Sequence, residues 1–238
     1  MASGKFVTFE GGDGAGKSTQ AQLLCQRLRR IQIDTDITRE PGGTPVAEAI
    51  RSVLLDPSLS QRSALSELVL FYAARADHLN LRIRPALDAG KWVICDRFID
   101  STRAYQGALG TNLTATIAHL EQLIVSPTFP DLTIILDVDP EIGMRRAIQR
   151  TYDPTPGSSL LREPSQLAFS FAPDRFEALD VDFHKKVRST FLDIAKLEPN
   201  RCVVVDSAGS IRDVADRVWL AVTQRLGIQA RNSGQPNK

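Results

Sequence analysis

The 238-residue sequence predicts an α/β fold: a doubly wound parallel sheet of five strands with helices on both faces. Short apolar runs alternate with longer amphipathic stretches along the chain, which is typical of strand–helix repeats. The short runs are apolar at successive positions, as expected of strands that are buried on both faces. Hydrophobic residues make up 42% and charged residues 24% of the chain, the ordinary balance of a globular domain.

The short apolar runs place the strands, and helical periodicity places the helices between them. We expect strands at residues 5–10, 33–38, 91–96, 132–137 and 201–206. We expect helices at residues 17–30, 44–54, 63–77, 115–124, 140–149, 175–197 and 210–225. In the first helix Ala21, Leu24 and Leu28 share one face. The third helix is expected to continue toward residue 89 with an interruption at Pro85.

Two segments do not fit this alternation. Residues 151–173 contain four prolines and no clear period, and a loop of that length is typically a lid or a disordered segment. We expect a solvated loop, with packing over the site or against another subunit as the alternative. The polar tail 228–238 is expected to be disordered, which leaves one domain over residues 1–227.

Charge, cysteines and apolar run lengths exclude other classes of protein. With 29 Lys+Arg against 28 Asp+Glu, the chain lacks the basic footprint of a protein that binds a nucleic-acid polymer. No apolar run approaches the roughly 20 residues that span a bilayer, so no membrane partner is expected. The odd, widely spaced Cys25, Cys95 and Cys202 favour buried thiols in a reducing compartment. The first strand begins too early to leave room for a secretory signal, so we expect a cytoplasmic protein.

A glycine-rich segment joins the first strand to the first helix. It matches the phosphate-loop pattern G-x-x-x-x-G-K-[ST] and comprises Gly11, Gly12, Asp13, Gly14, Ala15, Gly16, Lys17 and Ser18, followed by Thr19. Glycines let backbone N–H groups turn inward around phosphate oxygens, and the helix adds its positive end. Lys17 is expected to reach the β- and γ-phosphates of ATP, and Ser18 to hold Mg²⁺. The predicted architecture is therefore the three-layer sandwich of the P-loop NTPases, with a flexible lid.

Other features separate the P-loop classes. A GTP-binding switch needs the guanine-reading motif N-K-x-D, which the sequence lacks. The D-x-x-G match at residues 206–209 lies too near the C-terminus to be followed by one. Mechanical and DNA-directed ATPases are normally longer chains. A short domain with a second, arginine-rich phosphate pocket and a lid is typical of a small kinase.

Four blocks of sequence carry a resemblance to a known family. They are Phe9-Glu10-Gly11 with Asp13, then Thr38 to Pro45, then Leu70 to Arg75, then Asp96-Arg97-Phe98 with Ser101-Thr102 and Ala104 to Gly107. From about Phe6 to Leu226 the chain resembles the thymidylate kinases of the bacterial type. The resemblance implies phosphorylation of dTMP to dTDP by ATP and Mg²⁺ through direct in-line transfer, and a homodimer.

Two of these blocks make chemical sense alone. Arg39 at a strand end can meet a phosphate as a bidentate fork. Phe71 and Arg75 are spaced i,i+4 and share a helix face, where a ring and a guanidinium can stack on a pyrimidine and bond its edge. The alternative is a core phenylalanine beside a solvated arginine. The resemblance implies that Phe71 stacks on thymine and that Arg75 bonds its O4 atom.

The resemblance also assigns the other acceptor residues. It implies that Asp96 handles Mg²⁺, often through water, or positions the acceptor phosphate, and that Arg97 grips both phosphates. A structural ion pair is the alternative for these two. Thr102 and Gln106 would contact the base, and Tyr105 would pack on the sugar near C2′.

The sugar and adenine contacts follow in the same way. Asp13 would meet the sugar 3′-hydroxyl or help to hold the metal, unless it is only a turn residue. Arg146 would stack on adenine, and the backbone of Ser207 and Ala208 would line the adenine pocket.

The catalytic arginine is expected from the lid, at about residues 145–175, because Gly14 occupies the loop position where many thymidylate kinases carry an arginine. Arg150 is the first candidate and Arg175 the second. The insertion at residues 151–173 departs from the short lid of the family.

The expected reaction needs no covalent intermediate and no histidine. His78, His119 and His184 are expected in helices away from the motifs, without a role. Two alternatives stay open: another nucleotide or deoxynucleoside kinase with a changed base pocket, and a nucleotide-binding regulatory module that transfers no phosphate.

Overall fold

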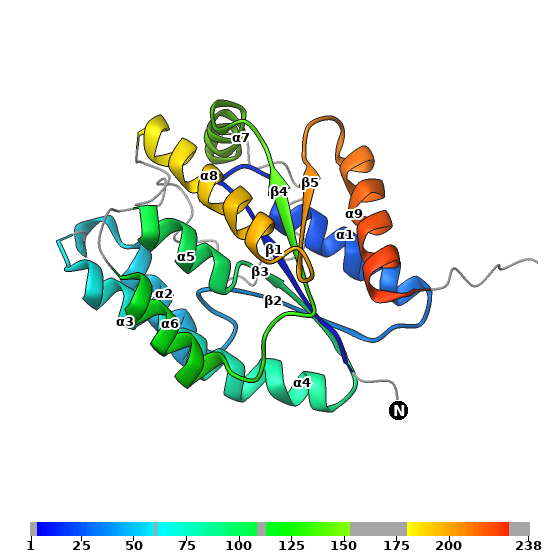
Figure 1. The fold of residues 1–238 in the computed structure, drawn as a ribbon, viewed down its shortest axis with the longest axis horizontal. Helices are drawn as coiled ribbons and strands as arrows, with labels where there is room; N and C mark the ends of the chain where they lie inside the picture. The colour runs from blue at the N-terminus through cyan, green and yellow to red at the C-terminus, as the bar shows by residue number, and fades with distance from the viewer. Residues whose placement is uncertain (1–3, 60, 109–112, 153–179, 229–238) are drawn as a thin grey trace, which may run out of the picture.

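The computed structural model describes residues 4–59, 61–108, 113–152 and 180–228. At its centre is a parallel sheet of five strands in the order β2-β3-β1-β4-β5. Their bounds are Phe6–Glu10 (β1), Thr35–Arg39 (β2), Trp92–Asp96 (β3), Leu132–Asp137 (β4) and Cys202–Asp206 (β5). The five-stranded parallel sheet flanked by helices confirms the predicted fold class (Figure 1).

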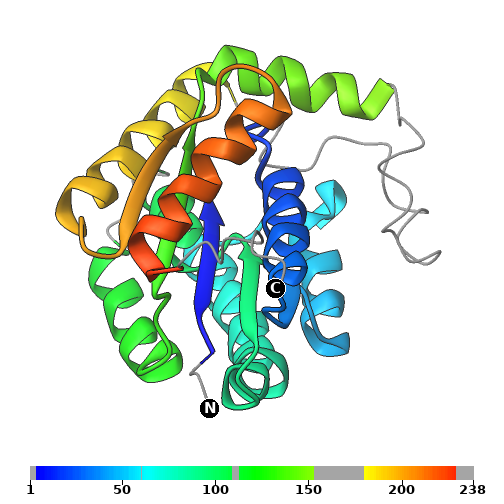
Figure 2. The ribbon, with the colours of Figure 1, turned by 90° about the vertical axis from the view of Figure 1, so that its right-hand side faces the viewer.

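Helices form the two outer layers. Two of them, α1 (Lys17–Arg30) and α9 (Ile211–Leu226), pack side by side on one face of the sheet and are turned toward the viewer in Figure 2. The others are α2 (Pro45–Leu55), α3 (Ala64–His78), α4 (Arg84–Asp88), α5 (Ile99–Ala108), α6 (Thr114–Leu120), α7 (Pro140–Tyr152) and α8 (Val181–Leu197). Of these, α3, α5 and α8 contribute to the core on the opposite face.

Strand side chains alternate between the two faces and so divide the core. Val7 and Phe9 pack with Leu24 and Leu28 of α1 on one side. Phe6 packs on the other side, in a cluster with the residues of α3. Because the strands are parallel, their carboxyl ends lie at one edge, which is where the candidate residues gather.

The structure differs from the predicted elements in three places. The helix expected to break at Pro85 instead widens before it, in a π-helical turn at Leu79–Ile83, and α4 then carries the proline in its first turn. A wide turn accommodates the missing N–H and the ring of Pro85 without ending the helix. Helix α8 begins at Val181, not at residue 175, because the Asp180 side chain caps it by accepting from the N–H of Phe183. Helix α5 was not expected at all.

The thiols of Cys25, Cys95 and Cys202 are free and buried, as predicted. Among the described residues, none of the helices is long and apolar enough to cross a membrane. Helix α7 includes the first two residues of the segment 151–173, and the rest of that segment and the tail from residue 229 lie outside the described residues.

Candidate active site

The phosphate loop leaves β1 at the carboxyl edge of the sheet and enters α1. Gly11 and Gly14 have positive φ angles of 129° and 71°. A Cβ atom at Gly11 would lie 2.4 Å from the carbonyl oxygen of Leu136, and one at Gly14 would lie 1.9 Å from that of Gly143. Glycine is therefore required for the loop to pass this close to β4 and α7. Helix α1 has no acidic residue in its first turn and no side-chain cap, so its amino end stays electropositive.

Lys17 lies folded over this loop. Its Nζ atom donates to the carbonyl oxygens of Gly11 at 3.1 Å and Gly12 at 2.7 Å, and the residue is buried. Burial and then the nearby Arg97 guanidinium lower the pKa of Lys17 to about 8, against the opposing effect of neighbouring carboxylates. A phosphate bound in the loop would supply the negative charge that this buried ammonium lacks.

Ser18 and Asp96 meet at the start of α1. The Ser18 hydroxyl donates to Oδ2 of Asp96, the last residue of β3. Hydroxyl and carboxylate oxygens are the ligands that Mg²⁺ prefers, and Mg²⁺ is usually held by one or two carboxylates together with substrate phosphates. Within the described ranges no cluster of three or more His, Cys, Asp or Glu residues could hold a metal by itself. The pair therefore fits a magnesium ion that a nucleotide brings with it.

Arg97 connects the phosphate loop to α5. It has a left-handed φ of 68°, and its Nη1 donates to the Gly11 carbonyl at 3.2 Å and to Ser101 Oγ at 3.1 Å. Its Nη2 pairs with Asp13 and donates to the Tyr105 hydroxyl at 3.2 Å. The Tyr105 hydroxyl in turn donates to Asp13 at 2.8 Å. One guanidinium thus fixes a loop residue and a helix residue relative to each other.

Glu10 bonds two residues that follow Arg97 and so holds the turn at that arginine. Sequence analysis missed this role, although Glu10 belongs to the first resemblance block. The fully buried carboxyl accepts from the N–H of Phe98 at 2.8 Å and from Ser101 Oγ at 2.6 Å. Burial, then the neighbouring Asp100 carboxylate, raises the pKa of Glu10 to about 7. These bonds fix the turn in which Arg97 takes its left-handed conformation.

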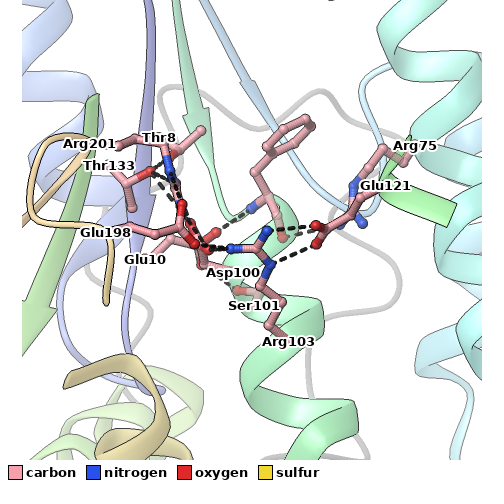
Figure 3. A network of polar contacts seen from close by, with 11 residues as sticks. Thr8, Glu10, Arg75, Asp100, Ser101, Arg103, Glu121, Thr133, Glu198 and Arg201 are labelled. Atoms are coloured by element: carbon pink, nitrogen blue, oxygen red, sulfur yellow. Dashed lines mark hydrogen bonds and ion pairs between the residues drawn. The ribbon is translucent and has the colours of Figure 1, made fainter. Parts of the chain in front are cut away.

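A network of ion pairs anchors the amino-terminal half of α5 (Figure 3). Arg201 donates to the buried Asp100 carboxylate at 2.7 Å and 3.0 Å. Arg103 forms a bidentate pair with Glu121 at 2.7 Å and 2.6 Å and also contacts Glu198. Because α5 is held at this end, its residues that face the site have a fixed position.

Arg75 lies between α3, α5 and the loop after β2, in a region that we call the base pocket because the resemblance places the acceptor base there. It is 2% exposed and donates through Nε to Glu40 at 2.7 Å and through Nη2 to Thr102 at 3.0 Å and to the Phe98 carbonyl at 3.1 Å. The alternative of a solvated arginine is therefore wrong. Its Nη1 atom is buried and has no hydrogen-bond partner. A bound base with a carbonyl oxygen would satisfy it.

The remaining acceptor candidates lie around this pocket. Phe71 is half-buried on α3, the helix that carries Arg75. The Gln106 side chain is buried and donates to Glu67 at 3.1 Å. Arg39, at the end of β2, forms an ion pair with Glu48 of α2 through Nη2, whereas its buried Nε has no partner. A phosphate would have to compete with the Glu48 carboxylate for the Arg39 guanidinium.

The adenine candidates lie together at the other end of the carboxyl edge. Arg146 of α7 donates to the backbone carbonyl of Ser207 at 3.3 Å, and Ser207 is buried whereas Ala208 is exposed. The backbone of Arg150 belongs to α7, but its side chain and the whole of Arg175 lie outside the described residues.

Two histidines lie at the site, so the expectation that all three are remote is wrong. His184 of α8 is buried, and its Nδ1 atom lies 4.0 Å from the Asp13 carboxylate. Its Nε2 atom has no partner, and the residue borders a cavity of about 20 Å³, room for about one water. His78 is buried beside Glu40. Only long-range packing brings them here; of the three, His119 alone is exposed.

Burial opposes the ionised form of Asp13, but Arg97 and Lys17 lower its pKa below the ordinary value. The site therefore combines a phosphate loop, a serine–aspartate pair that fits a cation, and a buried arginine with an unsatisfied donor. These features define a P-loop kinase that acts on a small phosphorylated acceptor.

Comparisons with known proteins name the family. The family described as thymidylate kinase matches residues 9–218. A thymidylate kinase of Nitrobacter hamburgensis is 48% identical over 226 residues, covering 95% of this chain and 91% of that protein. One from Caulobacter vibrioides is 43% identical over 228 residues, covering 96% and 100%. The crystal structure of thymidylate kinase from Ehrlichia chaffeensis matches with a TM-score of 0.71 at 34% identity, covering 92% and 99%. The chain belongs to the thymidylate kinase family, and it is accordingly a kinase of the step from dTMP to dTDP in dTTP synthesis.

Proposed function

We propose that the chain phosphorylates dTMP by moving the γ-phosphoryl group of ATP directly onto a phosphate oxygen of the acceptor, with Mg²⁺. The observation that carries this proposal is the position of Arg97. Its guanidinium touches the phosphate loop at Gly11 and α5 at Ser101 and Tyr105. The same helix carries Thr102, which bonds Arg75 in the base pocket. Donor and acceptor sites therefore share one rigid connection.

The residues divide the work of transfer. The loop N–H groups and Lys17 bind the donor phosphates, and Lys17 and Arg97 stabilise the negative charge of the transferring group. Ser18 and Asp96 hold Mg²⁺, which neutralises phosphate charge when it is bound. Arg39 binds the acceptor phosphate, and Phe71, Thr102 and Gln106 bind the base together with Arg75. The nucleophile is already an oxyanion, so no covalent intermediate is required.

Further assignments rest on the family. Asp13 and Tyr105 contact the acceptor sugar, and Asp13 also helps to hold the metal. Arg146 with the backbone of Ser207 and Ala208 binds adenine. The lid supplies a further cation, Arg150 or Arg175, to the transferring phosphoryl group.

The chain is proposed to act as a cytoplasmic homodimer. An apolar groove on the outside of α2 and α3 is lined by Pro45, Val46, Ala49, Ile50, Val53 and Leu70. Val46 is 54% and Val69 is 49% exposed, and apolar side chains gathered on a surface are typical of protein interfaces. Sedimentation equilibrium is expected to give twice the mass of the chain; a single monomeric species would contradict the dimer.

Identification of the products tests the proposal. With dTMP, ATP and Mg²⁺, chromatography is expected to show equal amounts of dTDP and ADP, and chelation of Mg²⁺ is expected to stop both. Release of ADP without dTDP would indicate ATP hydrolysis. Binding of ATP without turnover of any nucleoside monophosphate would favour the regulatory alternative.

A further inference from the structure

Four buried side chains form a continuous hydrogen-bonded chain behind the base pocket. Thr38 Oγ1 lies 2.7 Å from His78 Nε2, and His78 Nδ1 lies 3.1 Å from Glu40 Oε1. The other oxygen of Glu40 accepts from Arg75 Nε at 2.7 Å. All four residues are at least nine-tenths buried, so water does not compete for these bonds. The chain runs from the end of β2 to the arginine that we place against the base.

The contacts leave the Glu40 carboxyl between two partners. Its Oε2 atom accepts from Arg75 Nε, and its Oε1 atom lies 3.1 Å from His78 Nδ1. The Thr38 hydroxyl, which can donate or accept, pairs with the other ring nitrogen of His78.

This chain fixes the direction of the Arg75 guanidinium. Nε bonds Glu40 and Nη2 bonds Thr102, while the Tyr72 and Phe98 rings lie 4.8 Å and 5.1 Å from the guanidinium carbon. Only Nη1 has no partner. A buried N–H without an acceptor costs free energy, and a ligand that offers an acceptor removes that cost.

Gly43 makes room for the histidine. A Cβ atom there would lie 2.5 Å from His78 Nε2 and 2.6 Å from Thr38 Oγ1. Glycine at this position therefore leaves the space in which His78 and Thr38 meet.

We propose that His78 and Glu40 are positioning residues that set the base selectivity of the acceptor site, by holding Arg75 Nη1 as a fixed hydrogen-bond donor. This inference rests on the proposed function. A fixed donor accepts a pyrimidine with a carbonyl oxygen at position 4 and rejects one with an amino group there, because two donors would face each other. Selectivity of this kind is large when a buried polar group is left unpaired by the wrong substrate.

The test compares dUMP with dCMP, which differ only in the hydrogen-bonding edge of the base. In His78→Leu, the ratio of kcat/KM for dUMP to kcat/KM for dCMP is expected to fall about tenfold or more. The KM for dTMP is expected to rise about tenfold, which is the size of effect that the loss of one hydrogen bond to a charged group has on binding. The KM for ATP is expected to stay within about twofold of the wild-type value, because the four hydrogen-bonded side chains do not touch the phosphate loop. His78→Asn, which keeps an N–H near Nδ1, is expected to restore most of the selectivity. The exposed His119→Leu serves as the matched control and is expected to match the wild type.

Other outcomes separate the possible failures. An unchanged dUMP to dCMP ratio in a folded His78→Leu would overturn the inference, as would equal losses for ATP and dTMP. If His78→Leu does not fold, Glu40→Gln is used in the same assay; it keeps the volume but weakens the hold on Arg75, and an unchanged ratio there overturns the inference equally. If the wild-type chain does not phosphorylate dTMP, the proposed function itself has failed.

Discussion

The phosphate loop and the base pocket are built in different ways. In the loop, eight consecutive residues carry the site, and Lys17 is held by the backbone carbonyls of its own loop. In the base pocket, side chains from α3, α5 and the loop after β2 are bonded to one another before any ligand arrives, as Arg75 shows with Glu40 and Thr102.

The difference has a consequence for the effect of substitutions. Contacts made by backbone groups survive most side-chain changes, so in the first region we expect large effects only from changes of Lys17, Ser18 and the loop glycines. In the second region each side chain depends on a partner, so a change behind the pocket reaches the substrate.

Loss of Lys17 is expected to have the largest effect. In Lys17→Ala, kcat is expected to fall by about 10²–10³-fold or more, because a cation aimed at the transferring phosphate is lost. Thermal unfolding is expected to be nearly unchanged, since the Gly11 carbonyl keeps its bond from Arg97 and the change removes a buried ammonium. The exposed Lys185→Ala is the control. Near-normal turnover in a folded Lys17→Ala would refute the donor site.

Arg97 lies between the two regions, so its loss is expected to affect both. Arg97→Asn removes the guanidinium while Asn tolerates the left-handed backbone better than most residues. We expect kcat to fall by about 10²-fold and the KM values for ATP and dTMP to rise together. A change confined to one substrate in steady-state kinetics would show that Arg97 belongs to one region alone. Arg212→Ala, on the exposed surface of α9, controls for the loss of a positive charge.

Glu10 is expected to give the smallest effect, in stability. Its pKa is about 7 in the folded protein against an ordinary value of 4.5. The folded state therefore binds more protons than the unfolded state between these values, and stability falls as pH rises through this window. Glu10→Gln removes this titration. Between pH 4 and pH 8 its free energy of unfolding is therefore expected to rise relative to that of the wild type, by about 3 kcal/mol at most. Urea unfolding across this range measures it, and parallel curves for the two proteins would contradict it.

Local patterns were enough to predict the donor region. The bounds of α1 and β4 agree with the sequence prediction at every residue, because one is a regular amphipathic repeat and the other an unbroken apolar run. The phosphate loop depends on adjacent residues alone. The metal role of Asp96 came from the family resemblance and not from a local pattern. The structure brings its side chain to Ser18, and metal binding by the pair stays a prediction.

The acceptor region could be predicted only in part. Helix α5 was missed because its buried face carries Asp100, Thr102 and Gln106, which a hydrophobic period counts as solvent-facing. They are buried because partners distant in sequence satisfy them, such as Arg201 for Asp100. The roles of Glu10 and His78 depend on such long-range pairs in the same way, and no spacing in the sequence reveals them.

The most direct test is the turnover of the wild-type chain with ATP and Mg²⁺ across dTMP, dUMP, dCMP, UMP, AMP and GMP, followed as ADP release. We predict the highest kcat/KM for dTMP, with dCMP lower by about 10²-fold or more, because Arg75 offers a buried donor to the base. A preference for dCMP or for a purine monophosphate would keep the phosphate loop and contradict the base pocket. No turnover with any acceptor would contradict the kinase itself.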